Sequence, residues 1–263
     1  MLNWCNSNQI FINWHKTKFM FIHNKKNAFM PNSITIGNDE IEVVQSFKLL
    51  GIIIDASLLF TDCIKAMKKS INTKLYSFKK LFFLSKSVKS HFFKAFIQPH
   101  FDYCSALAVY LNKTQLKNIE KFQKVALFRL LNVKLFGLDH LTQKATLDKY
   151  KLMPYLMRLC FRLSTFCHKV TNKLLLISFS NNLVFKENCC SLSDCQDNCK
   201  RSKEIVSLPD IRTNFGRRSF TYFLPKFINC ILKKNHEMCA KNFKLFLLNN
   251  LNVIFENFTK NFV

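Results

Sequence analysis

The spacing of hydrophobic residues changes near residue 60, and this change separates a strand-rich start from a helical remainder. Before it, short apolar runs are broken by polar or proline-containing stretches, a pattern typical of short strands and turns. The pattern predicts strands at residues 9–13, 18–23, 34–36, 43–47 and 49–54. The last of these gives the strongest signal, because it is an apolar run that ends at an aspartate.

From residue 61 onwards apolar residues recur every three or four positions, as they do on one face of a helix. The first helix is predicted to start at Thr61 as its cap, with Asp62 in its positively polarised first turn. The apolar stripe predicted to face inward consists of Ile64, Met67, Ile71, Leu75, Phe78 and Phe82.

The same periodicity predicts four further helices. The second begins near Ser85 or Ser87 and ends or kinks by Pro99, and the third is capped by Thr114. The fourth covers residues 154 to about 176, and the last covers residues 238–250. Residues 186–210 are polar, rich in cysteine and without a period, which predicts a loop.

These elements predict an α+β fold that is mainly helical. We expect three regions along the chain. Residues 1–54 supply the strands, residues 55–135 form a helical bundle, and residues 136–263 form a helical extension that includes the Cys-rich loop near 186–210.

The composition adds a strong positive charge to this picture. The 263 residues include 40 Lys and Arg against 16 Asp and Glu, a formal net charge of +24. Such a charge attracts polyanions, nucleic acid first and anionic membrane surfaces second. A solvated basic surface, with a contribution from AT-rich codons, stays open as the plainer explanation.

Nine lysines concentrate this charge in the first two predicted helices, with no acidic residue between them. Because lysine contacts phosphates as a point charge, they predict nucleic-acid binding without sequence preference. Phe83 and Phe93 in the same segment could stack on bases, although a Phe on an amphipathic helix is usually part of the core. The lysines are Lys65, Lys68, Lys69, Lys74, Lys79, Lys80, Lys86, Lys89 and Lys94.

The first residues lack the charged start and apolar stretch of a signal peptide. No apolar run approaches the length of about 18 residues that spans a bilayer. We therefore expect an intracellular protein of the nucleus or cytoplasm, not secreted and without a membrane span. In that setting the 11 cysteines are expected to be reduced thiols.

The Cys-rich loop is the one place where a metal site has to be weighed. Its cysteines lack C-x-x-C spacing and the nearest histidine, His168, is distant, whereas zinc needs four ligands around one point. We therefore expect free thiols, no metal-binding residues and no cofactor. The histidines show no H-E-x-x-H or triad-like pattern, which disfavours a hydrolase. The cysteines in question are Cys189, Cys190, Cys195 and Cys199.

Several short motifs follow one another in the order of a known family. The first half holds Trp4, Gln9-Ile10-Phe11-Ile12-Asn13, Lys16-Thr17-Lys18, Phe47-Lys48-Leu49-Leu50-Gly51-Ile52-Ile53-Ile54-Asp55 and Gln98-Pro99-His100-Phe101-Asp102-Tyr103-Cys104. The second half holds Ile119-Glu120-Lys121-Phe122-Gln123-Lys124, Arg212-Thr213-Asn214, Gly216-Arg217-Arg218-Ser219-Phe220, Pro225 and Asn229. Together they resemble the C-terminal part of the reverse transcriptase of a non-LTR, LINE-like retrotransposon of the jockey type.

The resemblance implies a palm remnant in residues 1–54, a polymerase thumb in residues 55–135 and the family's C-terminal extension beyond them. Leu49, Leu50 and Gly51 stand in the segment that the family uses as its primer grip. Leu49 takes the place of an aromatic residue that is usual there, and Ile228 takes the place of a tryptophan.

The resemblance implies no catalytic residues in this chain. Polymerases of this type hold two metal ions on aspartates, and the chain contains no Asp-Asp pair. Its one adjacent acidic pair, Asp39-Glu40, follows the Lys-Thr stretch, whereas the family's catalytic hairpin precedes it. Lys16 resembles a lysine that protonates departing pyrophosphate, here a vestigial general acid; a solvated lysine on a strand edge is the alternative. Mg²⁺ is expected only for a complete polymerase.

The predicted function is that of a truncated reverse transcriptase, an RNA-directed DNA polymerase fragment that is inactive alone and at most binds template-primer. Its expected partners are RNA or DNA and the missing polymerase half. Two alternatives stay open. One is a basic helical nucleic-acid-binding protein without polymerase ancestry, and the other is a peripheral membrane protein that uses a basic amphipathic helix.

Overall fold

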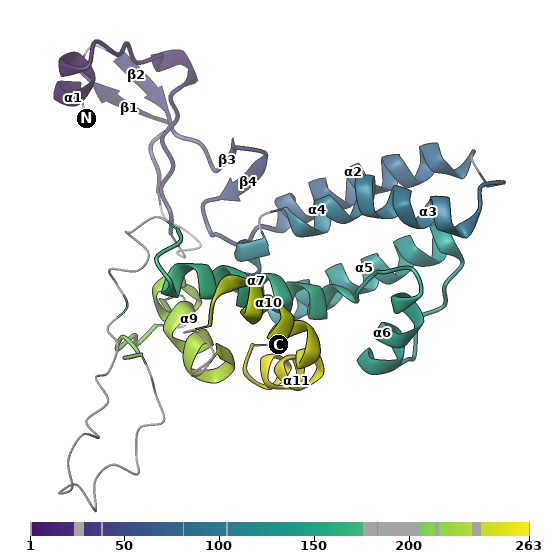
Figure 1. The fold of residues 1–263 in the computed structure, drawn as a ribbon. Helices are drawn as coiled ribbons and strands as arrows, with labels where there is room; N and C mark the ends of the chain where they lie inside the picture. The colour runs from purple at the N-terminus through teal and green to yellow at the C-terminus, as the bar shows by residue number, and fades with distance from the viewer. Residues whose placement is uncertain are drawn as a thin grey trace, which may run out of the picture. The chain divides into compact units, whose positions relative to one another are not determined.

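The protein is described from a computed structural model (Figure 1). The structure describes residues 2–23, 29–37, 39–80, 82–103, 105–175, 183, 206–213, 216–232 and 238–262. The chain divides into two compact units, Met1–Ser70 and Ile71–Val263. The described residues are mainly helical with two small antiparallel sheets, so the predicted α+β, mainly helical class is confirmed.

The first unit contains two separate two-stranded sheets. β1 (Ser33–Ile36) pairs with β2 (Asp39–Glu42), and β3 (Ser46–Leu49) pairs with β4 (Ile52–Asp55), both antiparallel. The predicted strand at residues 34–36 is therefore confirmed as part of β1.

A short helix and a helical turn precede these sheets. They are α1 (Leu2–Ser7) and a 3-10 turn at Trp14–Lys16. The strand predicted at residues 9–13 is wrong, because these residues form no strand. Of the stretch at 18–23, Phe19 forms one isolated parallel bridge with Val43.

The strongest predicted strand, residues 49–54, is a hairpin and not one strand. Leu49 pairs with Ile52, and Leu50 and Gly51 form the turn with φ angles of 48° and 85°. Positive φ at both central positions defines a type I′ turn, which matches the twist of the flanking strands. The prediction failed because the residue before the glycine is leucine and not asparagine, so that the turn is hidden inside an apolar run.

Asp55 organises the connection from β4 to the first long helix. Its carboxylate accepts hydrogen bonds from Ser57 Oγ at 2.7 Å and from the backbone N–H groups of Leu59 at 2.9 Å and Phe60 at 2.6 Å. Burial alone would raise the pKa of Asp55, but these hydrogen bonds outweigh it and the net pKa is lowered. Asp55 therefore organises the turn that follows β4.

The helix α2 (Thr61–Lys79) is followed by α3 (Lys86–Phe92), a π-helical turn at Phe93–Ile97 and α4 (Gln98–Asp102). Ser85 caps α3 by accepting the N–H of Val88, and Pro99 stands in the first turn of α4, so both predictions for this segment are confirmed. Ile71, Leu75 and Phe78 of the predicted stripe are buried. Phe82 is not, because the helix ends before it, and its side chain is 79% exposed.

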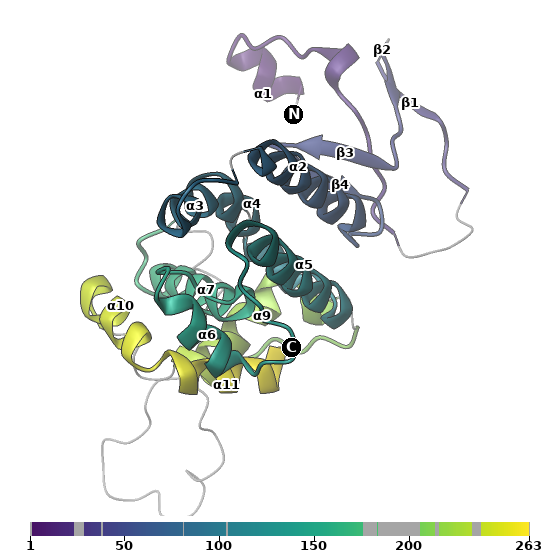
Figure 2. The same cartoon turned by 90° about the vertical axis from the view of Figure 1, so that its right-hand side faces the viewer.

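The second unit has six further helices among its described residues, and α7 contacts four of the others. The six are α5 (Lys113–Leu131), α6 (His140–Asp148), α7 (Tyr155–Thr171), α9 (Phe220–Phe227), α10 (Ala240–Asn249) and α11 (Leu251–Phe262). Figures 1 and 2 show α7 among α5, α9, α10 and α11, all of which it contacts. This central position explains why α7 has more buried residues than any other helix described. The periodicity had predicted α5, α7 and α10, but missed α6, α9 and α11.

The start of α5 differs from the prediction by two residues. Asn112, and not Thr114, is the N-cap: its side chain accepts the N–H of Gln115 at 2.8 Å, while the Gln115 side chain accepts the N–H of Asn112 at 2.9 Å. This reciprocal pair is a capping box formed with Asn and Gln in place of the commoner Ser and Glu.

Polar residues of the motif at 98–104 hold α4 against α7. Arg158 donates from Nε to Asp102 Oδ1 at 2.7 Å and from Nη2 to Asp102 Oδ2 at 2.5 Å. Phe101 is buried beside them, with its ring centroid 6.0 Å from that of Tyr155. The motif therefore has a structural explanation in packing and ion pairing.

The motif at 119–124 is structural as well. Gln123 is buried on α5, and its Oε1 accepts the backbone N–H of Tyr155 at 2.7 Å while its Nε2 donates to Met153 O at 3.2 Å. Because Tyr155 opens α7, a side chain of one helix caps the start of another. Glu120, also buried, forms an ion pair with Lys124 at 3.2 Å.

Candidate nucleic-acid interface

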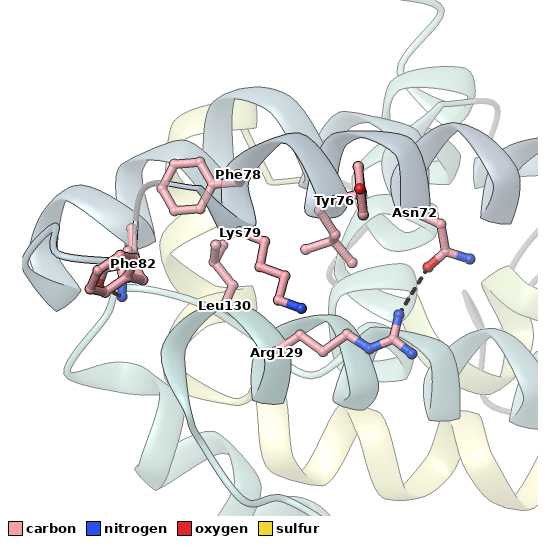
Figure 3. Close-up of a pocket in the computed structure, with 9 residues that line it drawn as sticks. Asn72, Tyr76, Phe78, Lys79, Phe82, Arg129 and Leu130 are labelled. Atoms are coloured by element: carbon pink, nitrogen blue, oxygen red, sulfur yellow. Dashed lines mark hydrogen bonds between the residues drawn. The ribbon is translucent and has the colours of Figure 1, made fainter.

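The second unit contains a groove formed by the last turns of α2, the turn after it, α3 and α5, which we call the α2–α5 groove (Figure 3). Its volume of about 570 Å³ lies within the range of roughly 300–1,000 Å³ that is usual for ligand sites. The lining residues are Asn72, Leu75, Tyr76, Phe78, Lys79, Phe82, Lys89, Arg129 and Leu130.

The floor of the groove is apolar and well packed. Leu75 and Phe78 of α2 and Leu130 of α5 are buried. Phe78 packs against Phe92 of α3 with the ring centroids 3.9 Å apart, which fixes α3 beside α2. The hydrophobic contact among the three helices therefore forms the floor of the groove.

The cationic side chains come from each of the three helices. Lys79 comes from α2, Lys89 from α3 and Arg129 from α5, and none of the nine lining residues is acidic. Figure 3 shows the Lys79 ammonium in the middle of the groove, with Arg129 and Asn72 toward one end and Phe82 at the other. Charge of one sign in a concave site raises the local concentration of anions.

Hydrogen bonds order two of these cations. Arg129 Nη1 donates to Asn72 Oδ1 at 3.2 Å, which ties α5 to α2. A guanidinium has five N–H donors, so this bond uses a minority of them. Lys89 Nζ donates to the carbonyl of Phe82 at 2.8 Å and so holds the turn that carries the Phe82 ring.

Two aromatic side chains line the groove and expose most of their surface. Tyr76 is 74% exposed and Phe82 is 79% exposed. Phe83 is exposed beside Phe82, with which it forms an edge-on pair at a centroid distance of 6.0 Å. Phe93 has no exposed surface, so the interpretation of this residue as core and not as a base contact is confirmed.

The structure places the nine predicted lysines in different settings. Helical spacing puts Lys65, Lys68 and Lys69 on the same side of α2 as Tyr76 and Lys79. Lys65 forms an ion pair with Asp62 at 2.9 Å. Lys79 and Lys89 line the α2–α5 groove. Three more lysines lie outside the groove and outside α2: Lys80 in the turn after α2, Lys86 at the start of α3 and Lys94 in the π-helical turn.

Lys74 points away from the other lysines of its helix. Its Nζ donates to the Phe96 carbonyl at 3.1 Å and lies 2.6 Å from His100 Nε2. Burial first, and then the positive charge of Lys74, lower the pKa of His100. A neutral His100 can accept a hydrogen bond from the Lys74 ammonium in this geometry, so Lys74 joins α2 to α4.

The primer-grip-like residues occupy the tip of the β3–β4 hairpin in the first unit. Leu49 is 50% exposed and Leu50 is 83% exposed, and Gly51 completes the turn. Lys16, predicted to be a vestigial general acid, is exposed at the end of the 3-10 turn and not on a strand edge. Its backbone N–H donates to Asn13 Oδ1 at 3.1 Å.

Within the residues that the structure describes, no group of three or more His, Cys, Asp or Glu side chains could hold a metal ion. The four cysteines of the predicted loop, at 189, 190, 195 and 199, lie outside these residues. Among the helices described, none is both long enough and apolar enough to cross a membrane.

Comparisons of the chain with known protein families, with curated proteins and with solved structures find no match in any of the three.

Sequence reasoning identified the lysines of the groove but not its other side chains. Tyr76 lies off the apolar stripe, which was a usable signal for a surface aromatic residue on a basic helix face. Arg129 gave no such signal, because it is separated from Asn72 by 57 positions and only the packing of α5 on α2 brings the two together.

Proposed function

We propose that this protein is the C-terminal part of a reverse transcriptase of the non-LTR, LINE-like type, and that by itself it binds RNA or DNA without sequence preference. The observation that supports binding most directly is the α2–α5 groove, where Lys79, Lys89 and Arg129 converge without an acidic neighbour. The ancestry rests on the order of the motifs in the sequence.

Phosphate contacts supply the affinity in this proposal. Lysine and arginine neutralise phosphates and release counterions, and they hold a nucleic-acid backbone without reading bases. If roughly four to six phosphates are neutralised, the logarithm of affinity falls with the logarithm of salt concentration at a slope of about −3 to −5.

A charge-neutral variant tests the proposal. Changing Lys68, Lys69, Lys79 and Lys80 together to Gln removes four charges while keeping good helix formers. Fluorescence anisotropy with labelled RNA and DNA, titrated with salt, should then give weaker binding and a shallower slope, to a similar degree for every sequence.

A matched control removes the same charge elsewhere. Changing four exposed lysines of other elements to Gln should leave most of the affinity and slope in place; they are Lys134, Lys241, Lys244 and Lys260. Equal losses of affinity in the two variants would show that binding depends on the net charge as a whole. Equal binding by the parent and the first variant would refute a role for these four lysines.

The same proposal predicts no polymerase activity for this chain alone, because the chain has no Asp-Asp pair to hold the catalytic metals. Primer extension on an RNA template, with Mg²⁺ and with Mn²⁺, should give no product. Template-dependent product that disappears on changing Lys16 to Ala would contradict this reading and return Lys16 to a catalytic role.

A second candidate is a basic helical nucleic-acid-binding protein without polymerase ancestry. The groove favours it equally, because its residues do not depend on descent. Genomic sequence that precedes the codon for Met1 separates the two, since a polymerase origin predicts an open or decayed frame there that encodes an Asp-Asp hairpin.

A further inference from the structure

We propose that the α2–α5 groove takes unpaired nucleotides, with Tyr76 and Phe82 stacking on bases and Lys79 and Arg129 contacting phosphates, so that the protein prefers single-stranded to double-stranded nucleic acid. The inference rests on the proposed function and specifies the form of nucleic acid that this site binds.

The exposure of the two rings supports stacking on bases. Tyr76 and Phe82 leave 74% and 79% of their surface exposed, although an apolar floor lies directly beside them. An aromatic face is a general platform for bases, because every base has a π-face, and stacking of this kind is tolerant of sequence. In a duplex the faces of the bases are covered by their neighbours, so the rings offer little to paired strands.

The order of chemical groups along the groove supports binding of a single strand. Phe82 lies at one end and Tyr76 toward the other, with the Lys79 ammonium between them (Figure 3). A single strand presents bases and phosphates in alternation, and a groove with ring, cation and ring matches that alternation. A surface that contacts phosphates only needs cations and gains nothing from the rings.

The backbone that carries each of the two rings is held in place by contacts with α3 and α5. Phe82 follows the end of α2, and the hydrogen bond from Lys89 Nζ to its carbonyl, 2.8 Å long, fixes this turn on α3. Tyr76 projects from a helix that is anchored on both sides by Phe78–Phe92 packing and the Arg129–Asn72 bond. Ordering of this backbone before binding reduces the entropy lost on binding.

The test compares three probes of equal length: a single strand, a hairpin duplex, and a single strand of abasic sugar-phosphate units. The abasic strand keeps the phosphates and lacks the bases. The parent protein should bind the ordinary single strand most tightly and the abasic strand about a hundredfold more weakly, because stacking on each of the two rings contributes about tenfold.

Variants assign the preference to the two rings. Tyr76→Leu and Phe82→Leu should each weaken binding of the ordinary single strand about tenfold, with no change for the abasic strand and with the salt slope retained. Tyr76→Phe keeps the ring and should bind like the parent. Phe136→Leu, at a 50% exposed residue outside the groove, is the control and should change nothing.

Thermal melting of each variant confirms that the fold is retained, which is expected because both groove rings are mostly solvent-exposed. Equal binding of ordinary and abasic strands, unaffected by either ring variant but dependent on the lysines, would overturn this inference and leave the proposed function standing. Absence of any salt-sensitive binding to all three probes would overturn the proposed function, and the inference with it.

Discussion

Arg158 on α7 and Asp102 at the end of α4 form a two-point ion pair, Nε to Oδ1 at 2.7 Å and Nη2 to Oδ2 at 2.5 Å. Arg162 adds a third contact, with its Nη1 3.5 Å from Asp102 Oδ2. The Asp102 side chain keeps only 15% of its surface exposed, so its carboxylate is largely removed from solvent, whereas the Arg158 side chain keeps 29%. Paired charges in such a setting are tolerated only while both partners remain.

The first prediction concerns this ion pair. Asp102→Asn should lower the free energy of unfolding by about 2 kcal/mol, because it leaves the partly buried Arg158 charge without its partner. Urea denaturation measures the change. Asp62→Asn, which breaks the exposed pair with Lys65, is the control and should cost about 0.5 kcal/mol or less. Equal effects of the two substitutions would show that the Asp102 pair is no more important than a surface contact.

The second prediction distinguishes the observed cap of α5 from the predicted one. Asn112→Ala should destabilise the protein by about 1 kcal/mol, since it removes the bond to the Gln115 N–H and half of the capping box. Thr114→Ala lies two residues inside the helix and should change the free energy of unfolding by less than about 0.5 kcal/mol. A larger loss for Thr114→Ala in urea denaturation would show that the helix starts where the sequence alone suggested.

The third prediction is a pH dependence at His100. Its pKa is lowered by burial and by Lys74, so below the ordinary value of 6.5 the unfolded chain binds a proton more readily than the folded one. The contribution of His100 to stability is therefore present above pH 6.5 and is lost as the pH falls through that value toward the folded-state pKa.

Lys74→Met isolates the charge from the burial. The substitution should raise the pKa of His100, but not fully to 6.5, because the apolar surroundings remain. An NMR titration of the imidazole carbons measures both proteins. An unchanged pKa in the variant would mean that the 2.6 Å approach of Lys74 Nζ to His100 Nε2 has no electrostatic consequence.

The features of this fold that were predicted from the sequence are those that depend on residues near one another in the chain. Periodic burial is local, so α5 and α7 were predicted as helices and Ile71, Leu75 and Phe78 of the α2 stripe as core. The start of α3 was predicted near Ser85 or Ser87, because a cap and its partner, here Ser85 and Val88, are only three residues apart. The hairpin was missed because Leu50 adopts a positive φ that its residue type disfavours, and the pairing of β3 with β4 overrides that preference.

The candidate site was predictable only in part, for the same reason. Its lysines form a run along the sequence, whereas the groove requires Arg129 and Leu130 of α5 to lie against α2. The capping of α7 by Gln123 is similarly long-range, across 32 positions, and no local rule identifies it. Contacts between distant segments depend on helix packing, which the spacing of residues does not encode.

The fourth prediction concerns the turn at Leu50 and Gly51. Leu50→Asn should stabilise the first unit by about 1 kcal/mol, because asparagine adopts the left-handed conformation at lower cost than leucine. Gly51→Val should destabilise it by a similar amount or more, since its φ of 85° suits glycine and disfavours a β-branched residue. Hydrogen exchange of the β3 and β4 amides measures both changes. A loss of protection in Leu50→Asn would contradict the turn assignment.

The fifth prediction concerns two thiols inside the helical unit. Cys160 and Cys167 are completely buried on α7. Burial raises the pKa of Cys160 to about 12, and burial together with the nearby Cys160 raises the pKa of Cys167. Because the thiolate is the reactive form, iodoacetamide at pH 8 should leave both unmodified in the folded protein while it alkylates the exposed Cys239. Peptide mapping by mass spectrometry gives the relative rates, and in urea all three should react alike. Labelling of Cys160 or Cys167 at the rate of Cys239 without denaturant would show that α7 is not the packed centre of this unit.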